Sequence, residues 1–173
     1  MSGGERGSMN DEERSYEKIE RDDLLRLAAL ARADREGLFA RRPRLGELYK
    51  SQLFCVALCQ GAALHFVDRR NGIKDFDIWT FFAEHPNGRI PVRRRAKADF
   101  GLSKFGRNPG DQGVTGRRVD FMMRAIRVGD GEDLVAAIRS YLGERRTKSS
   151  RSLAEKAVVI IEPEELCGVV VWP

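Results

Sequence analysis

Near the start of the chain, apolar residues recur at helical spacing. From about Tyr16 to Arg35, leucine and alanine return every three or four positions with Asp and Arg between them, which predicts an amphipathic helix. We expect Gly37 and the arginine–proline stretch that follows it to end this helix. A second, short helix is expected over Pro43–Lys50, because proline is well tolerated in the first turn.

In the middle of the chain, two apolar runs flank a helical stretch. Leu53–Cys59 is continuously apolar, and its periodicity alone fits either a buried strand or a helical segment. Ala62–Arg70 has helical spacing, and the Asn71-Gly72 pair after it indicates a turn. Phe76–Phe82 is rich in aromatic and β-branched residues, which predicts a strand.

Toward the C-terminus, strand and helix patterns continue to alternate. Arg118–Val128 predicts a strand, and Glu132–Arg145 predicts a helix for which Asp130 is a candidate N-cap. Thr147–Ser152 is expected to be a polar linker, followed by a helical turn around Leu153. Two further apolar runs predict strands over Ala157–Ile161 and Gly168–Trp172. The alternation predicts an α+β fold, with a small mixed β-sheet flanked by helices.

The length of 173 residues fits a single domain. Residues 1–14 contain little besides glycine, serine and charged residues, so we expect a disordered N-terminal tail. Residues 15–173 are expected to form one domain. Its helical N-terminal region covers 15–51, and a helix and strand extension covers 130–173.

Composition narrows the classes of function. The chain has 31 Lys and Arg against 26 Asp and Glu, a net charge of +5 that suits a protein handling phosphates or nucleic acid. No apolar run approaches the roughly 18 residues of a membrane span, and the N-terminus lacks the apolar segment of a secretory signal. We therefore expect a cytoplasmic protein without membrane contact.

Cysteine use agrees with that compartment. The three cysteines, an odd number, do not form a disulfide framework, and two of them lie four apart in an apolar run. Buried free thiols are expected at Cys55 and Cys59. A zinc site is not expected, because His65 alone does not complete its ligand set.

A long irregular segment, Asn87–Arg118, concentrates the positive charge. It holds nine basic and two acidic residues, a net +7, together with six glycines. A loop of this length is usually functional or mobile. The run Arg93–Lys97 within it has three interpretations: it contacts a nucleic-acid backbone, it holds a triphosphate or a phosphorylated acceptor, or it is a solvated loop.

Candidate chemistry begins with two carboxylates. On a strand, Asp75 and Asp77 project to one side, whereas Phe76 and Ile78 turn to the other side and the core. Asp120 lies in a second predicted strand, so the three carboxylates meet if the two strands are neighbours. Adjacent acids repel, and a hard cation such as Mg²⁺ relieves that repulsion.

The alternative is that these aspartates cap turns or pair with the many arginines of the chain. Arg118 lies close to Asp120 in sequence, but we expect it to point to the other face of the strand and so not to be its partner.

A phosphate-binding element is expected upstream of these acids. Gly61-Ala62 lies at a strand-to-helix junction, where free backbone amides form an anion site and glycine lets a phosphate approach the backbone.

Taken together, Gly61-Ala62, twelve further residues, Asp75-Phe76-Asp77-Ile78 and later Val119-Asp120-Phe121 resemble the nucleotidyltransferase superfamily, which has the DNA polymerase β-like fold. The stretch 71–74 before the paired aspartates is similar to that of minimal nucleotidyltransferases. The resemblance covers residues 53–128, less than half of the chain.

The resemblance implies roles for these residues. Asp75 and Asp77 would bind Mg²⁺, or Mn²⁺ in its place, and Asp120 would complete the metal site and help to activate an acceptor hydroxyl. Gly61 and Ala62 would hold the phosphates of a nucleoside triphosphate (NTP). Lys74, beside Asp75, is a further candidate phosphate contact, although an exposed lysine is the simpler interpretation.

The chain departs from the family pattern in three ways. Ala62 stands where the family usually has serine or glycine, so a hydroxyl contact to phosphate is lost. Gln60 is polar where the family prefers an apolar residue, and the insertion before the third aspartate is long and basic.

Two hypotheses follow from the resemblance. The first is a Mg²⁺-dependent nucleotidyltransferase that transfers NMP from an NTP to a hydroxyl of a small molecule, a protein or an RNA end. The second is an inactive module of the same fold that binds a nucleotide or nucleic acid. Because the chain is short, a homo-oligomer would be one way to complete an acceptor site.

Overall fold

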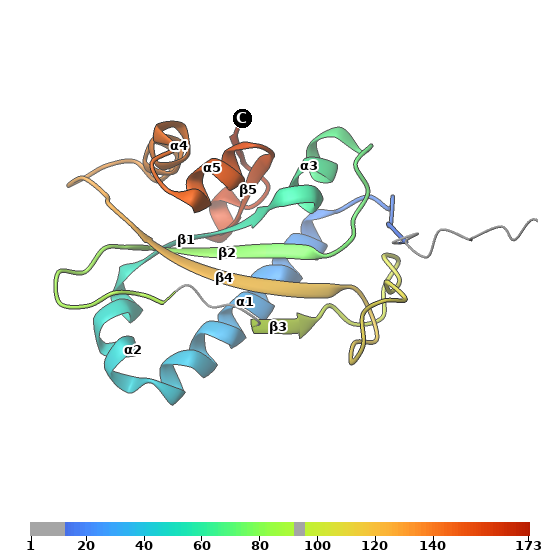
Figure 1. Ribbon diagram of the computed structural model, residues 1–173, viewed down its shortest axis with the longest axis horizontal. Coiled ribbons are helices and arrows are strands. Elements are labelled where there is room, and N and C mark those ends of the chain that lie inside the picture. Colours follow the sequence, from blue (N-terminus) through green and yellow to red (C-terminus); the bar gives the residue numbers. More distant parts are fainter. Residues whose placement is uncertain (1–12, 92–95) are drawn as a thin grey trace, which may run out of the picture.

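The computed structural model describes residues 13–91 and 96–173. Residues 1–12 of the predicted tail and residues 92–95, which include the three arginines of the basic run, lie outside this range. The fold is α+β, as the sequence predicts, with one mixed sheet between helices (Figure 1). The helices are α1 (Arg21–Arg41), α2 (Pro43–Tyr49), α3 (Gln60–Asp68), α4 (Leu134–Glu144) and α5 (Lys148–Ala154). The strands are β1 (Leu53–Cys59), β2 (Phe76–Ala83), β3 (Ala96–Asp99), β4 (Arg118–Ile126), β5 (Ala157–Glu162) and β6 (Val170–Trp172).

The sheet has the strand order β3-β4-β2-β1-β5-β6. Strands β2 and β4 pair in parallel, whereas the other neighbouring strands are antiparallel. The parallel register places Asp77 opposite Asp120. Leu53–Cys59, for which strand and helix were both open, is therefore a strand in the middle of the sheet.

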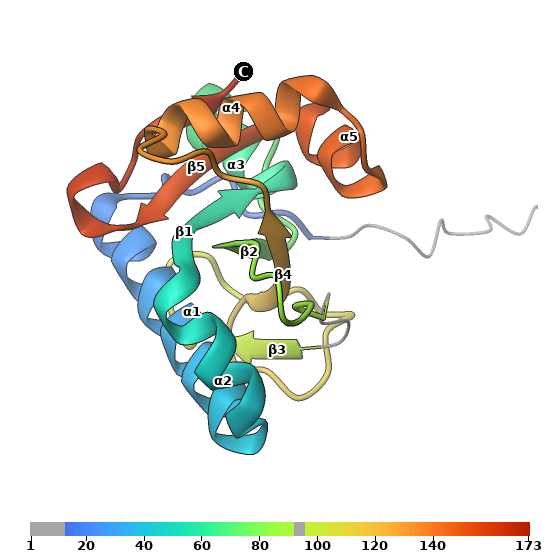
Figure 2. The same cartoon turned by 90° about the vertical axis from the view of Figure 1, so that its left-hand side faces the viewer.

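Helices cover both faces of the sheet. Helix α1 lies along one face, and α4 and α5 lie over the other (Figure 2). The core beneath α1 also includes residues of α3, and it takes in Phe76 and Ile78, as the alternation along this strand predicts. The core beneath α4 and α5 contains Trp79 and Phe81 from the opposite face of β2.

Helix α1 differs from its predicted bounds: it begins at Arg21 and continues through Gly37 to Arg41. Leu38 and Phe39 explain the extension, because both are buried in a third cluster with Tyr49 and Phe82. Burying two such side chains contributes about 3 kcal/mol or more, which exceeds the roughly 1 kcal/mol cost of a helical glycine.

Two predictions near the C-terminus were wrong. Asp133, not Asp130, caps α4, and its carboxylate accepts a hydrogen bond from the Ala136 amide. The expected polar linker is helix α5, which begins with a capping box: the Thr147 hydroxyl accepts from the Ser150 amide, and the Ser150 hydroxyl accepts from the Thr147 amide. The cap lets a short, polar sequence form a helix over the buried side chain of Leu153.

The three cysteines are free, and Cys55 and Cys59 are buried, as expected. In the part of the chain that the structure describes, none of the helices is both long and apolar enough to cross a membrane.

The segment that follows β3 is tied to the rest of the fold at several points, although most of its side chains are exposed. The Asp99 carboxylate accepts hydrogen bonds from the backbone amides of Gly101, Thr115 and Gly116. Burial raises the pKa of Asp99, but these hydrogen bonds outweigh it and hold the pKa below its usual value. Both ends of the segment are thus tied to one side chain. Phe100 and Phe105 complete its packing against the core.

Arg117 ties the same segment to its surroundings. Its guanidinium is buried and donates to the backbone carbonyls of Phe105, Glu13 and Lys74. Although Arg117 belongs to the basic stretch, it is an internal linker that fixes the chain just before Asp75.

The closest approach in this segment predicts a strong effect of one substitution. A Cβ added to Gly116 would lie 1.8 Å from the carbonyl oxygen of Gly101, so Gly116→Ala must displace backbone. We expect a loss of about 3 kcal/mol or more in unfolding free energy, measured by chemical denaturation. Gly110→Ala is the matched control, because the nearest atom to its added Cβ is 3.9 Å away. Equal stability of the two variants would contradict this packing.

Candidate metal and phosphate site

Three carboxylates meet at one end of the paired strands β2 and β4. Asp77 and Asp120 are register partners, and Asp75 precedes β2 on the same side as Asp77. One oxygen from each carboxylate lies within 4.8 Å of the other two. The structure thus brings together the three acids that the sequence singles out, because the two strands are neighbours.

Arg118 binds this cluster, contrary to the expectation that it points to the other face. Its guanidinium lies 2.8 Å from Asp75, 3.0 Å from Asp120 and 2.8 Å from Asp111. Residues 118 and 120 are two apart on a strand, so their side chains share a face. Arg118 thereby supplies positive charge to two of the three clustered carboxylates, Asp75 and Asp120.

The Asp77 carboxylate differs from its neighbours because it forms no ion pair or hydrogen bond with the described residues. Burial raises its pKa to about 7, and the charges of Asp75 and Asp120 act in the same direction. Burial also raises the pKa of Asp75, although the charge of Arg118 opposes that shift. An ionised Asp77 therefore lacks a sufficient counter-charge, which a divalent cation would provide.

A pocket of about 370 Å³ opens beside these acids. The expected phosphate-binding residues Gly61, Ala62 and Lys74 line it together with Asp75 and Asp77. Its remaining lining residues are Arg14, Gln60, Trp79, Met122, Ser152 and Lys156. The pocket thus combines carboxylates, cations and the beginning of a helix.

Helix α3 begins directly after β1, so Gly61 and Ala62 lie in its first turn. Amides in the first turn of a helix lack intrahelical partners and face an anion favourably. The Ala62 side chain is buried in the core, and this position therefore offers its backbone amide alone. Packing also favours glycine at position 61. An added Cβ would lie 3.0 Å from the side-chain nitrogen Nδ2 of Asn71, which donates a hydrogen bond to the Gly61 carbonyl.

The C-terminal helices add a wall that the sequence did not predict. The Gln60 side chain donates to the Ser152 hydroxyl at 3.2 Å and so links the start of α3 to α5. Lys156 follows α5 and lowers the pKa of Asp77 by its charge. Ser152 and Lys156 are 75 to 81 positions from Asp75 and Asp77 in sequence and 32 to 36 from Asp120, and no local signal connects them.

Trp79 also lines the pocket. It is buried, but its indole N–H has no hydrogen-bond partner among the described residues. An unpaired buried donor is costly, so this group is available to a ligand in the pocket.

The two histidines have structural roles. Nδ1 of His65 accepts from the Gly72 amide, and Nε2 lies 3.0 Å from the Glu17 carbonyl. His85 lies in a turn, where its Nδ1 accepts from the Asn87 amide.

The donor set fits a hard divalent cation. Carboxylate oxygens are the ligands that Mg²⁺ and Mn²⁺ prefer, and three of these groups lie together here, two of them lining the pocket. One of them, Asp77, lacks a partner among the described side chains.

A scan against models of protein families finds no match, and searches of curated proteins and of solved structures find none either.

The first prediction from this geometry concerns Arg118→Gln. Without divalent ions, the substitution leaves the carboxylates uncompensated, and we expect a loss of about 2 kcal/mol. Because the ion no longer competes with a guanidinium, saturating Mg²⁺ should raise the melting temperature more in this variant than in the wild type. Thermal denaturation with and without Mg²⁺ measures both effects.

Arg127→Gln is the control for that experiment, since Arg127 lies just after the same strand and is exposed. Its response to Mg²⁺ should match the wild type. An equal Mg²⁺ response in all three proteins would contradict competition between Arg118 and a cation.

The second prediction concerns pH. The pKa of Asp77 is about 7 in the folded protein and about 3.9 when unfolded, so the folded state holds a proton that the unfolded state loses. Metal-free wild-type stability should therefore fall as pH rises from 4 to 7. Asp77→Asn should stabilise the metal-free protein at pH 8, by at most about 4 kcal/mol, and by progressively less toward pH 4.

Denaturation of both proteins in a chelator across this pH range measures the difference. Asp130→Asn, at an exposed position, is the matched control and should leave the curve unchanged. A stability difference that does not vary with pH would show that Asp77 is not the responsible group.

Proposed function

We propose that the protein is a Mg²⁺-dependent nucleotidyltransferase of the cytoplasm, which transfers NMP from an NTP to an acceptor hydroxyl. The observation that supports it best is the meeting of Asp75, Asp77 and Asp120 within 4.8 Å beside the beginning of α3. Carboxylates hold the cations of phosphoryl transfer, and helix N-terminal amides bind phosphate. Both requirements fall in one pocket.

In this proposal Asp75 and Asp77 hold the metal, and Asp120 completes its ligand set. When bound, the metal neutralises phosphate charge and makes the acceptor hydroxyl easier to deprotonate. The amides of Gly61 and Ala62 bind the terminal phosphates.

Asp120 accepts the proton of the acceptor hydroxyl. The hydroxyl oxygen forms a bond to the α-phosphorus as the bond to the bridging oxygen breaks, and pyrophosphate leaves. Lys74 and Lys156, both lining the pocket, offset the charge of the departing pyrophosphate.

Arg118 has to release two carboxylates before they can hold a cation. Its third partner, Asp111, lies in the packed segment after β3 and keeps the guanidinium at the edge of the site. Arg118 then faces the triphosphate as a fixed cation.

One observation favours a second candidate, a module that binds a nucleotide without turnover. Arg118 already neutralises Asp75 and Asp120, so phosphate binding at α3 does not require a metal in this arrangement. The two candidates differ in whether pyrophosphate is released.

The test begins with thermal shifts for each of the four NTPs, with and without Mg²⁺. Binding at 100 times the dissociation constant stabilises a protein by about 2.7 kcal/mol. We expect a Mg²⁺-dependent shift in the wild type that Asp75→Asn/Asp77→Asn abolishes. Asp22→Asn/Asp130→Asn removes two exposed carboxylates outside the pocket and should retain it.

The stabilising NTP, labelled in its α-phosphate, is then incubated with RNA, protein and small-molecule acceptors, and pyrophosphate release is measured. Release that depends on Asp75 and Asp77 supports the transferase. A thermal shift without release from any acceptor supports the binding module, and no shift with any NTP overturns both.

A further inference from the structure

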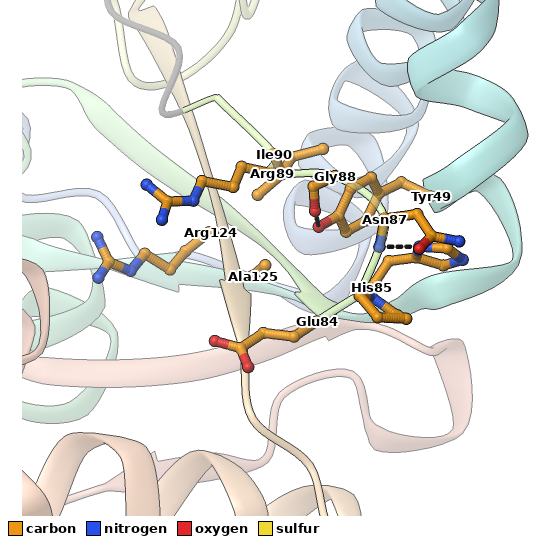
Figure 3. Close-up of a pocket in the computed structure, with 10 residues that line it drawn as sticks. Tyr49, Glu84, His85, Asn87, Gly88, Arg89, Ile90, Arg124 and Ala125 are labelled. Atoms are coloured by element: carbon orange, nitrogen blue, oxygen red, sulfur yellow. Dashed lines mark hydrogen bonds between the residues drawn. The ribbon is translucent and has the colours of Figure 1, made fainter.

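We propose that Arg89 and Arg124 form a phosphate-binding subsite for the acceptor, which is a nucleic-acid strand. This inference rests on the proposed function, because it assigns the acceptor of that reaction. The subsite is a second pocket, of about 970 Å³, at the end of β2 and β4 away from the carboxylates (Figure 3).

The two sites share one face of β4. Asp120, Met122 and Arg124 are alternate residues of this strand, so their side chains project to the same side. Met122 lines the pocket beside the carboxylates, and Arg124 lines the pocket at the far end. A third pocket of about 610 Å³, also lined by Arg124, is bordered by residues of α4 and α5.

Strand geometry sets the distance between the two sites. At about 3.3 Å per residue, the four residues from Asp120 to Arg124 span roughly 13 Å. A stacked nucleic-acid strand advances about 3.4 Å per nucleotide, so this span corresponds to about four nucleotides. A strand whose terminal hydroxyl lies at Asp120 therefore places an upstream phosphate at Arg124.

Arg89 and Arg124 line the same pocket, and in Figure 3 their side chains extend in the same direction, one from the loop after β2 and one from β4. The loop is fixed at its base, where the Tyr49 hydroxyl donates to the Gly88 carbonyl at 2.6 Å. Glu84 lies apart from both guanidinium groups and is within 4.0 Å of Arg127 instead. Both guanidinium groups thus extend from backbone segments that are held in place.

Within residues 13–91 and 96–173, neither Arg89 nor Arg124 has a carboxylate within 4.0 Å. Two neighbouring like charges repel, and an anion between them removes that cost. Guanidinium groups match phosphate oxygens with paired donors. Lys97 adds a third exposed cation, since it pairs across the sheet with Asp120 and so faces the same side.

Other cations of the basic segment are already engaged. Lys104 binds Glu20 and Asp23, and Arg117 and Arg118 bind the backbone and the carboxylates. Arg107 donates a hydrogen bond to the Asp111 carbonyl. Arg89 and Lys97 are therefore the described cations of this segment that have neither an ion pair nor a side-chain hydrogen bond. A volume of about 970 Å³ is at the upper end for ligand pockets, which suits part of a strand better than a single phosphate.

The test is the binding of a fluorescently labelled, single-stranded RNA of eight nucleotides, measured by anisotropy in a chelator and without NTP. We expect Arg89→Gln/Arg124→Gln to weaken binding at least tenfold. If both side chains contact phosphates, the slope of log K against log salt should fall by about 1.4. Arg32→Gln/Arg41→Gln removes the same charge from α1, on the other face of the sheet, and should bind within twofold of the wild type.

Three further measurements identify the source of the phosphate. In each, one unlabelled compound competes with the labelled RNA: a DNA strand of equal length, AMP or inorganic phosphate. Binding of RNA or DNA that depends on the two arginines supports the proposal. Equal affinities for the α1 control and the Arg89/Arg124 variant overturn it. Arginine-dependent binding of AMP or phosphate, with no binding of either strand, overturns the nucleic-acid acceptor and leaves a small phosphorylated acceptor in its place.

This assay requires neither metal nor nucleotide, so its result is independent of the proposed transferase. If RNA binds through Arg89 and Arg124 but no NTP shifts the melting temperature, the subsite stands and the nucleotidyl transfer fails. If the NTP shift and pyrophosphate release are observed but RNA and DNA do not bind, the transferase stands and the nucleic-acid acceptor is wrong.

Discussion

Three carboxylates held within 4.8 Å repel one another, and the site depends on how that repulsion is balanced. Parallel pairing of β2 and β4 creates the problem, because it sets Asp77 opposite Asp120. Arg118 reduces the repulsion in part, because it forms ion pairs with Asp75 and Asp120. Asp77 has no such partner among the described residues and has a raised pKa. Binding of a divalent cation would therefore be electrostatically favourable, but the cation would compete with Arg118 for Asp75 and Asp120.

Arg117 directly precedes β4 and Arg118 begins it, and the side chains of these adjacent residues point in opposite directions and have different roles. Arg117 turns inward and is satisfied by three backbone carbonyls, which hold the packed segment and the approach to Asp75 in place. The next side chain turns to the carboxylates. The basic segment is thus partly an internal counter-charge, and its net charge alone overstates the surface available to a polyanion.

One face of β4 connects the chemistry to the proposed acceptor. The carboxylate end offers metal ligands and helix amides, and the far end offers Arg89 and Arg124 without carboxylate partners among the described residues. Helices α4 and α5 border this face, and Gln60 links α5 to the beginning of α3. Nucleotide and acceptor would then meet on a surface fixed by the sheet, which keeps the two reactive groups in register.

The sequence by itself determined the α+β class, the strands that carry the acids and the helix junction at Gly61, because these follow from local periodicity and turn residues. It missed the length of α1 and the helical nature of α5, where burial of Phe39 and a cap at Thr147 decided the outcome. Three features appeared only in the tertiary structure. Arg118 binds the carboxylates, Ser152 lines the pocket beside them, and Arg89 and Arg124 line a second pocket together. Strand alternation does predict that Arg118 and Asp120 share a face, because they are two residues apart. The contacts of Asp75 with Arg118, of Ser152 with Gln60 and of Arg89 with the pocket of Arg124 join residues distant in sequence, so no local pattern encodes them.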